Sequence, residues 1–320
     1  MVDNVIDMDT ESSLSIVIPV YNEEENLPIL LDQMEKELQK YKYEIIVVDD
    51  GSSDNSLNVI LDVQKRNNRV KAIKLFQNYG QTAALDAGFS AAKNEIIVTL
   101  DADLQNPVED IHKLINGIKE GNDVVCGWRV NRNDTFGKKL MSRLAYRLRK
   151  AVLNDPVHDA GCTLRAYRRE VLSGLSLFGE MHRFIHVILR WRGCRITEIP
   201  VGHNERRYGK TKYGFSRVFK GVLDLIVVKF WLDYSSRPIY VFGGLGLGLT
   251  SIGMALAVYL AALKVLFEEA LSNRPLLLLA IFLMVIGTQF IFFGLLADVM
   301  TKLYYDHNKS KYYVVEKTYE

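Results

Sequence analysis

The sequence predicts an α/β fold with a mostly parallel, doubly wound sheet, followed by interfacial amphipathic helices and two transmembrane helices. Over the first two hundred residues, short apolar runs rich in Val and Ile alternate with amphipathic stretches, which is typical of parallel strands joined by helices. Further along, two long segments carry no charged residue. With 320 residues, 48% of them hydrophobic, the chain is long enough for one or two domains with full cores.

The elements of the sheet follow from the positions of these runs. We expect strands at residues 14–20, 43–48, 70–75, 95–100 and 123–126, and helices at 26–39, 56–66 and 107–119. Right-handed crossovers between such strands give a sheet that binds ligands at the carboxyl ends of its strands. The sequence has neither a GxGxxG nor a Walker A motif. Any phosphate is therefore expected to be held by a metal and side chains and not by a glycine-rich loop.

The two uncharged segments lie between Arg237 and Lys264 and between Arg274 and Asp298. As helices rising about 1.5 Å per residue, both are long enough to cross a hydrocarbon core of about 30 Å. A buried hairpin in a soluble domain is the alternative. Several glycines between residues 243 and 253 favour close packing of membrane helices, and we therefore expect two spans and a possible homo-oligomer formed through them.

The charges next to the spans predict the orientation. From Arg206 to Arg237 there are eight Lys or Arg residues and two Asp, whereas the loop from Lys264 to Arg274 is balanced, so the positive-inside rule puts both termini in the cytoplasm. The N-terminal tail predicts no cleaved signal peptide. The net charge of +2 gives no indication of nucleic-acid binding, and none is expected. The three cysteines are far apart, which argues against a disulfide framework or a CxxC metal site.

Two basic amphipathic segments are expected near the membrane. In residues 135–153, Lys and Arg alternate with Leu, Met and Tyr, which is typical either of an interfacial helix or of a solvated charged face. Residues 215–234 run directly into the first span, so here the interfacial interpretation is favoured.

Acidic residues follow three of the expected strands, where an open sheet binds its ligands. Asp101 and Asp103, with Gln105 two residues on, offer hard oxygen ligands for a divalent cation. Asp7 and Asp9 share the spacing without a strand before them, so the context carries the signal. Tyr21-Asn22-Glu23 and Asp49-Asp50-Gly51-Ser52 follow the other two strands. For Asp50 a ribose or base contact is favoured over a helix cap, whereas for Asp54 a cap is favoured.

With these motifs the sequence resembles the family 2 glycosyltransferases of the A-type, Rossmann-like fold, and among them the polyprenyl-phosphate glycosyltransferases related to dolichol-phosphate mannose synthase. The resemblance covers nearly the whole chain. The two C-terminal spans are similar to those of bacterial members that load glucose or an aminoarabinose derivative onto undecaprenyl phosphate. The resemblance rests on the motifs at the strand ends, on Asn78-Tyr79-Gly80-Gln81, on residues 101–107 and 159–169, and on Arg206-Arg207-Tyr208-Gly209-Lys210-Thr211-Lys212-Tyr213.

The resemblance implies a domain order and a reaction. We expect a polar tail at 1–13, a cytoplasmic glycosyltransferase domain at 14–213, juxtamembrane amphipathic helices at 214–237, a transmembrane hairpin at 238–298 and a cytoplasmic tail at 299–320. The implied reaction is inverting transfer of one sugar from a nucleotide sugar, UDP-glucose or another UDP-hexose first, to undecaprenyl phosphate at the cytoplasmic face of the membrane. A GDP-mannose-using dolichol-phosphate mannose synthase type is the rival enzyme. A non-catalytic membrane scaffold is the rival of another class.

The resemblance also implies roles for individual residues. Mg²⁺ or Mn²⁺ would be held by Asp101, Asp103 and Gln105. Catalytic roles would fall to Asp103, Asp159 and Arg207. The nucleotide would be bound by Pro19, Tyr21, Glu23, Asp50, Asp101 and Arg129. The acceptor phosphate would be bound by Arg143, Arg206, Lys210 and Lys212, although the last three also fit a plain positive-inside signal.

Two tempting motifs are weaker. His182 and His186 have the spacing of zinc ligands, but no third ligand is evident, and packing is favoured. Arg190-Trp191 is similar to part of the QxxRW motif of processive polysaccharide synthases, but Val187 replaces the glutamine, which argues against polymer synthesis.

Overall fold

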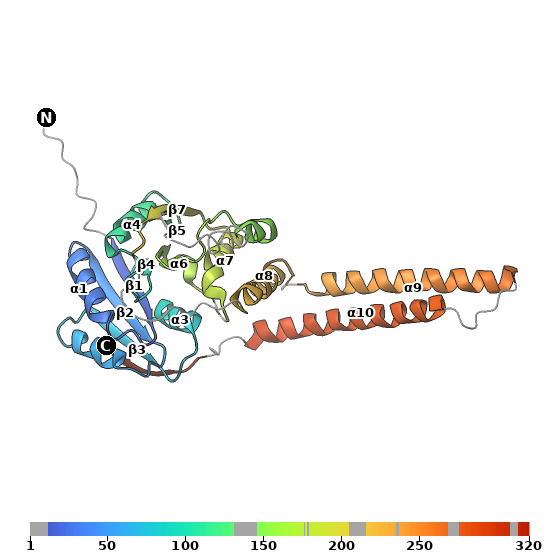
Figure 1. Cartoon of the computed structure of the whole chain (residues 1–320), viewed down its shortest axis with the longest axis horizontal. Coiled ribbons are helices and arrows are strands. Elements are labelled where there is room, and N and C mark those ends of the chain that lie inside the picture. Colours follow the sequence, from blue (N-terminus) through green and yellow to red (C-terminus); the bar gives the residue numbers. More distant parts are fainter. Residues whose placement is uncertain are drawn as a thin grey trace, which may run out of the picture. The chain divides into compact units, whose positions relative to one another are not determined.

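The computed structural model describes residues 12–130, 146–175, 177, 179–204, 216–234, 237–267, 275–307 and 313–319 (Figure 1). The chain forms two compact units. The first comprises Met1–Val228 together with Tyr312–Glu320, and the second comprises Lys229–Lys311. Each unit is described by itself.

Within its described residues, the first unit is built on an eight-stranded sheet in the order β7-β5-β6-β4-β1-β2-β3-β8. The strands are β1 Ser13–Val20, β2 Lys42–Asp49, β3 Val70–Leu75, β4 Ile96–Thr99, β5 Val124–Arg129, β6 Arg165–Arg168, β7 Ile196–Val201 and β8 Val315–Tyr319. β1 to β4 pair in parallel, as do β5 and β7, whereas β6 and β8 run antiparallel to their neighbours. The predicted α/β fold with a mostly parallel sheet is confirmed.

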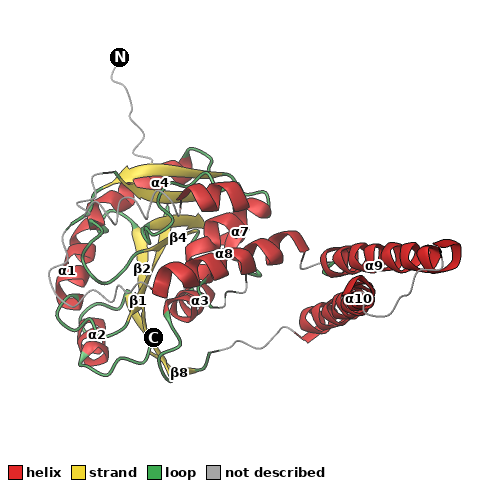
Figure 2. Cartoon of the chain, turned by 45° about the vertical axis from the view of Figure 1, so that its right-hand side comes forward, coloured by secondary structure: helices red, strands yellow, loops and turns green. Residues whose placement is uncertain are grey.

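Helices cover both faces of this sheet (Figure 2). Their bounds are α1 Leu27–Glu37, α2 Ser56–Gln64, α3 Gln81–Ala91, α4 Ile111–Lys119, α6 Arg169–Leu172 and α7 Ile185–Trp191, with 3-10 turns η1 Val108–Asp110 and η2 Met181–Phe184. A further helix, α8 Ser216–Tyr234, contains the boundary between the two units. Alternate strand residues belong to different cores: Ile16 and Ile18 pack on one face, and Val17 on the other. Strands covered on both faces are apolar throughout, which explains the unbroken Val and Ile runs.

Helix α3 lies unusually close to the sheet. Its inner side is formed by small residues, and a Cβ added to Gly88 would lie 2.2 Å from Cγ1 of Val17 in β1. Alanines 83, 84 and 87 complete this buried side. The close packing brings the start of α3 next to the carboxyl ends of the central strands, where the acidic residues lie.

The C-terminal strand β8 belongs to the first unit although it follows the second along the chain. It pairs with β3, and just before it the Tyr313 hydroxyl donates a hydrogen bond to Oδ2 of Asp86 in α3 at 2.8 Å. Both ends of the second unit are therefore connected to the first unit.

The second unit is a pair of long helices, α9 Ile239–Phe267 and α10 Pro275–His307. Segments Ile239–Phe267 and Pro275–Thr301 are long and apolar enough to cross a membrane, with mean hydropathies of 1.9 and 2.6 and only 11% of the apolar window buried in each. The helices touch through glycines, since a Cβ added to Gly246 would lie 2.5 Å from the carbonyl oxygen of Gly287. A hairpin in the core of a soluble domain would be mostly buried, so these exposed apolar helices favour the membrane interpretation.

Candidate active site

The acidic residues of the motifs meet at one edge of the sheet. β1, β2 and β4 are neighbours and parallel, with Val20 opposite Asp49 and Val17 opposite Thr99. The residues that follow these strands, 21–23, 50–52 and 101–103, therefore leave the sheet from the same edge. This register brings the three acidic loops to one end of the sheet, as expected from the sequence.

The 101–105 segment forms a tight turn directly after β4. Leu104 has a positive φ of 60°, a strained conformation for a leucine, and its side chain is 6% exposed, so its burial helps to hold the turn. The backbone N–H of Gln105 donates to Oδ1 of Asp103 at 3.2 Å, and Nε2 of Gln81 at the start of α3 donates to Oδ1 of Asp101 at 2.7 Å. Both carboxylates are thereby fixed by the fold.

The electrostatics of Asp101 show which charges share the site. Removal of the carboxyl group from water, with the Asp103 carboxylate beside it, raises the pKa of Asp101 to about 7. The Arg129 guanidinium lowers this pKa and the Glu23 carboxylate raises it, so both lie within electrostatic range of Asp101. Two carboxylates that repel each other at a sheet edge are a favourable place for a cation.

The donor set fits a divalent metal shared with a ligand. Asp101, Asp103 and Gln105 offer two carboxylates and one amide oxygen, the hard oxygen donors that Mg²⁺ and Mn²⁺ prefer. Among the described residues, no group of three or more His, Cys, Asp and Glu side chains is arranged to hold a metal by itself. A metal held by Asp101, Asp103 and Gln105 would take its remaining ligands from water or from a bound molecule.

Arg129 and Asp159 form a bidentate ion pair at the end of β5. Nε of Arg129 lies 2.7 Å from Oδ2 of Asp159, and Nη2 lies 2.9 Å from Oδ1, with side-chain exposures of 10% and 13%. A Cβ added to Gly161 would lie 3.3 Å from Nη2 of Arg129, so the small residue leaves room for the pair. The sequence predicts nucleotide binding for Arg129 and a catalytic role for Asp159, and in the structure the two side chains are paired.

Asn22 holds the loop after β1 to the loop after β2. No role for this residue was predicted from the sequence. Asn22 has φ 58°, and its Oδ1 accepts the backbone N–H of Ser53 at 2.8 Å. In return the backbone N–H of Asn22 donates to Oγ of Ser52 at 2.9 Å. Tyr21, beside it, is 37% exposed and accessible to a ligand. Pro19 lies within β1, opposite Val48 of β2.

Asp50 has a different environment from the one expected. Its two carboxylate oxygens accept the backbone N–H groups of Tyr79 and Gly80, both at 2.8 Å, so it holds the loop that leads into α3. Burial raises the pKa of Asp50 against these two hydrogen bonds, which lower it. The neighbouring Asp49 uses Oδ1 to accept the N–H of Ser52, while its buried Oδ2 has no partner among the described residues. The sequence does not distinguish the two adjacent acids.

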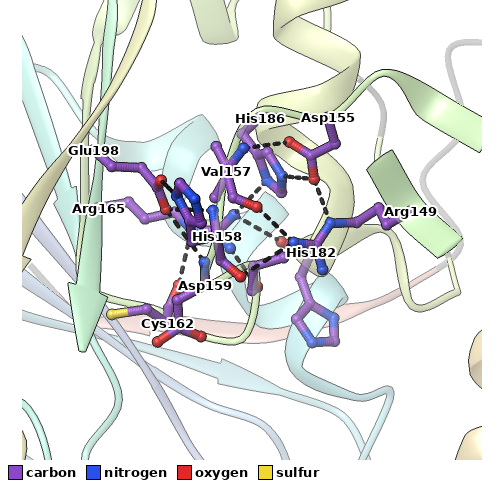
Figure 3. Close-up of polar contacts among 11 residues, drawn as sticks. Arg149, Asp155, Val157, His158, Asp159, Cys162, Arg165, His182, His186 and Glu198 are labelled. Atoms are coloured by element: carbon purple, nitrogen blue, oxygen red, sulfur yellow. Dashed lines mark hydrogen bonds and ion pairs between the residues drawn. The ribbon is translucent and has the colours of Figure 1, made fainter. Parts of the chain in front are cut away.

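The two histidines both contact Arg165, whose Nη1 donates to the backbone oxygen of His182 at 3.5 Å and to Nδ1 of His186 at 3.3 Å (Figure 3). Their rings have different further partners. His182 contacts Oγ1 of Thr82 through Nδ1 at 2.8 Å, whereas Nε2 of buried His186 lies 2.9 Å from Oδ2 of Asp155. His186 is packed in the interior, whereas His182 is half-buried. The predicted acceptor-phosphate and catalytic residues Arg143, Arg206, Arg207, Lys210 and Lys212 lie outside the described residues.

Comparison with known proteins decides the family. Residues 15–175 match the family model described as Glycosyl transferase family 2. The chain belongs to this family. The protein is therefore a glycosyltransferase, and the resemblance that the motifs indicated is confirmed.

Curated relatives extend the similarity over the whole chain. The chain is 36% identical to the dodecaprenyl-phosphate galacturonate synthase of Rhizobium johnstonii, over 96% of this chain and 93% of the relative. It is 37% identical to the undecaprenyl-phosphate 4-deoxy-4-formamido-L-arabinose transferase of Enterobacter sp., over 95% of this chain and 93% of the relative.

Among solved structures, the glucosyl-3-phosphoglycerate synthase of Mycobacterium tuberculosis, in complex with Mn²⁺, UDP and glucosyl-3-phosphoglycerate, has a TM-score of 0.56 at 20% identity. The match covers 71% of this chain and 83% of that one. The same TM-score is found at 15% identity for the mannosyl-3-phosphoglycerate synthase of Rubrobacter xylanophilus, over 68% and 74% of the two chains. At these identities the likeness concerns the fold alone, and it agrees with the A-type sheet described above.

Proposed function

We propose that the protein transfers a single sugar, with inversion, from a nucleotide sugar to a polyprenyl phosphate at the cytoplasmic face of the membrane. The proposed donor is a UDP-hexose, UDP-glucose first, and the proposed acceptor is undecaprenyl phosphate. The observation that carries the proposal is the meeting of Asp101, Asp103 and the Arg129–Asp159 pair in one electrostatic site at the sheet edge. The two apolar helices and the polyprenyl phosphates in the relatives' names support a lipid acceptor.

The transfer is a single displacement. An oxygen of the acceptor phosphate attacks the anomeric carbon as the bond from that carbon to the nucleoside diphosphate breaks, which inverts the configuration. A phosphate monoester has a second pKa near 6, so the acceptor is mostly ionised at neutral pH and needs no strong general base. Asp159 therefore orients the reacting groups, and Arg129, held by it, offers positive charge to the phosphates.

Asp101, Asp103 and Gln105 are proposed to hold Mg²⁺ or Mn²⁺, which would neutralise charge on the leaving diphosphate as a Lewis acid. Tyr21, with Pro19 and Glu23 near it, is proposed to contact the nucleoside. The basic residues at 206, 207, 210 and 212, together with Arg143, are proposed to hold the acceptor phosphate against repulsion by the donor.

The orientation in the membrane is proposed from the connections of the chain. Both ends of the helical hairpin lead into the first unit, so an even number of spans leaves that unit and both termini on one side, and the basic flanks favour the cytoplasm. Leu223, Ile226 and Val227 of α8 are 47%, 58% and 46% exposed, which suits an interfacial helix. An impermeant thiol reagent that labels a cysteine at residue 320 in intact cells would contradict this orientation.

The test of function is transfer of radiolabel from a panel of UDP- and GDP-sugars into an organic-extractable lipid. The full-length protein in detergent is supplied with undecaprenyl phosphate, with and without EDTA, beside Asp103→Asn. Label from one UDP-sugar, abolished by EDTA and by the variant, is the expected result. Label from GDP-mannose instead would overturn the proposed donor, and folded protein that transfers from no donor would favour a scaffold.

A further inference from the structure

Glu198, on β7, is a half-buried carboxylate that no motif of the sequence singles out. Its side chain is 12% exposed, and it faces the turn that carries Asp159 (Figure 3). Oε1 accepts the backbone N–H of His158 at 2.7 Å and that of Asp159 at 3.2 Å. Oε2 lies 2.7 Å from Nδ1 of the His158 ring. One carboxylate therefore binds both the backbone and the side chain of this turn.

Strand pairing and hydrogen bonds connect Glu198 to the Asp159–Arg129 pair. β7 pairs in parallel with β5, with Glu198 opposite Cys126 and Val201 opposite Arg129. The backbone of Asp159 is held by β7 through Glu198, and its carboxylate is held by β5 through Arg129. The orientation of the Asp159–Arg129 pair therefore depends on an acceptor at position 198 that reaches the two N–H groups of the turn.

The residue next to Asp159 is held from two further sides. The His158 ring is stacked between Trp128 of β5, with centroids 4.8 Å apart and planes 19° apart, and Tyr146, at 5.0 Å and 18°. Tyr146 lies within the helical residues 146–153. The contact with Oε2 fixes the rotation of this ring between its neighbours. The turn is thus constrained by hydrogen bonds and by stacking.

We propose that Glu198 is a positioning residue for the transfer reaction, which holds the 158–159 turn so that the Asp159–Arg129 pair keeps its orientation toward the acidic edge of the sheet. The inference rests on the proposed function, because Asp159 is assigned to the reaction there. The essential property of Glu198 is the length of its side chain, since an acceptor must reach the backbone of the turn. The charge of Glu198 is secondary.

Three substitutions separate length from charge. Glu198→Gln keeps the length and an acceptor oxygen but removes the charge, whereas Glu198→Asp keeps the charge and is one methylene too short. Glu198→Ala removes both. Misplacement by about 1 Å can lower a rate about 100-fold, so we expect kcat to fall about 30- to 100-fold in the Asp and Ala variants and by no more than about 5-fold in the Gln variant. The KM for the donor and the Kd for UDP should change less than kcat, because the diphosphate is proposed to be held through the metal at Asp101, Asp103 and Gln105 as well as by Arg129.

The control is Asp123→Ala. Oδ2 of Asp123 accepts the backbone N–H of Arg195 at 2.8 Å, so this carboxylate also binds a backbone group at the β5–β7 pair, but at the opposite end of those strands. We expect its kcat to stay within about 2-fold of the wild type. Equal losses in Asp123→Ala and Glu198→Ala would indicate a general structural effect and overturn the inference.

Two readouts are needed on the full-length protein in detergent: steady-state transfer and hydrogen exchange of the peptide that contains residues 158 and 159. Faster exchange in Glu198→Asp than in Glu198→Gln, together with the lower kcat, is expected. The reverse order of the two variants, unchanged exchange in both, or a kcat loss matched by an equal loss of UDP affinity would overturn the inference. An inactive wild type would overturn the proposed function, and the exchange order would still decide whether Glu198 orders the turn.

Discussion

Asp155 and Asp159 stand four residues apart on one segment, and each pairs with an arginine, yet their surroundings differ. Oδ2 of Asp155 contacts both Arg149 and His186, and its Oδ1 accepts the N–H of Val157, with the side chain 0% exposed. Asp159 is 13% exposed and pairs with Arg129, whose charge also acts on Asp101. The Asp155 carboxylate is fully enclosed, whereas the Asp159 carboxylate is partly exposed and its arginine acts on the acidic edge.

The protonation states follow from this difference. Burial raises the pKa of Asp155, but the hydrogen bond from His186 and the charges of His186 and Arg149 lower it to about 2. Nδ1 of His186 accepts from Nη1 of Arg165 at 3.3 Å, so its Nε2 carries the proton and donates to Asp155. Of the two arginine–carboxylate pairs, only Arg129–Asp159 indicates the site, because the charge of Arg129 acts on Asp101.

The largest effect is expected from Asp155→Asn, which leaves the Arg149 guanidinium without its buried counter-charge. Removing one partner of a buried pair costs about 3 to 5 kcal/mol, so the free energy of unfolding of the first unit should fall by that amount. Urea unfolding followed by circular dichroism measures it. Asp62→Asn is the control, because the Asp62–Lys65 pair is exposed and its loss should not shift the midpoint. Equal shifts in both variants would contradict the structural role of Asp155.

Asp159→Asn should act more on the rate than on the fold. The variant keeps the size of the side chain but releases the charge of Arg129, and a loss of about 100-fold in kcat, or about 2.7 kcal/mol, is expected. Its urea midpoint should fall less than that of Asp155→Asn, because the Asp159 carboxylate keeps some contact with water. If Asp159→Asn unfolded as readily as Asp155→Asn while the folded fraction kept its kcat, the assignment of the two aspartates would be reversed.

The parts of the fold that could be predicted from the sequence are those with a local signal. Residues 43–48 predicted β2 because buried parallel strands are mostly apolar on both faces. Residues 70–75 predicted β3 through their four apolar residues, although Lys71 and Lys74 are half-buried. The antiparallel β6 is only four residues long and reads Arg-Ala-Tyr-Arg, and β8 pairs with a strand some 240 residues earlier, so neither has a local signal. Their places are decided by tertiary contacts.

The candidate site shows the same division. The strand-end motifs identified the sheet edge, but the sequence did not show that Asp50 binds backbone N–H groups or that Arg129 pairs with Asp159. Glu198 had no signal, since a single acid in a half-buried strand is ordinary. His182 and His186 share a helical spacing, yet η2 ends between them. The ring of His182 bonds to Thr82, and the ring of His186 bonds to Asp155.

The smallest effect expected is a pH dependence that separates the two aspartates through His186. Burial lowers the pKa of His186 from 6.5 to about 4, despite the Asp155 hydrogen bond, which raises it. Below pH 6.5 the unfolded chain therefore binds a proton that the folded chain does not, and the free energy of unfolding falls as the pH falls. At about 1.4 kcal/mol per pH unit, the loss between pH 6.5 and pH 5 should be about 2 kcal/mol.

Asp155 adds nothing in that window, because its depressed pKa gives stability that is present above 3.8 and lost only as the pH falls through about 2. His186→Gln removes the titrating group and keeps a donor for Asp155, so the stability of this variant should change less between pH 6.5 and pH 5. Urea midpoints at four pH values measure the difference. Parallel curves for the wild type and His186→Gln would mean that His186 does not titrate with folding, and that the Asp155 cluster tolerates acid through other groups.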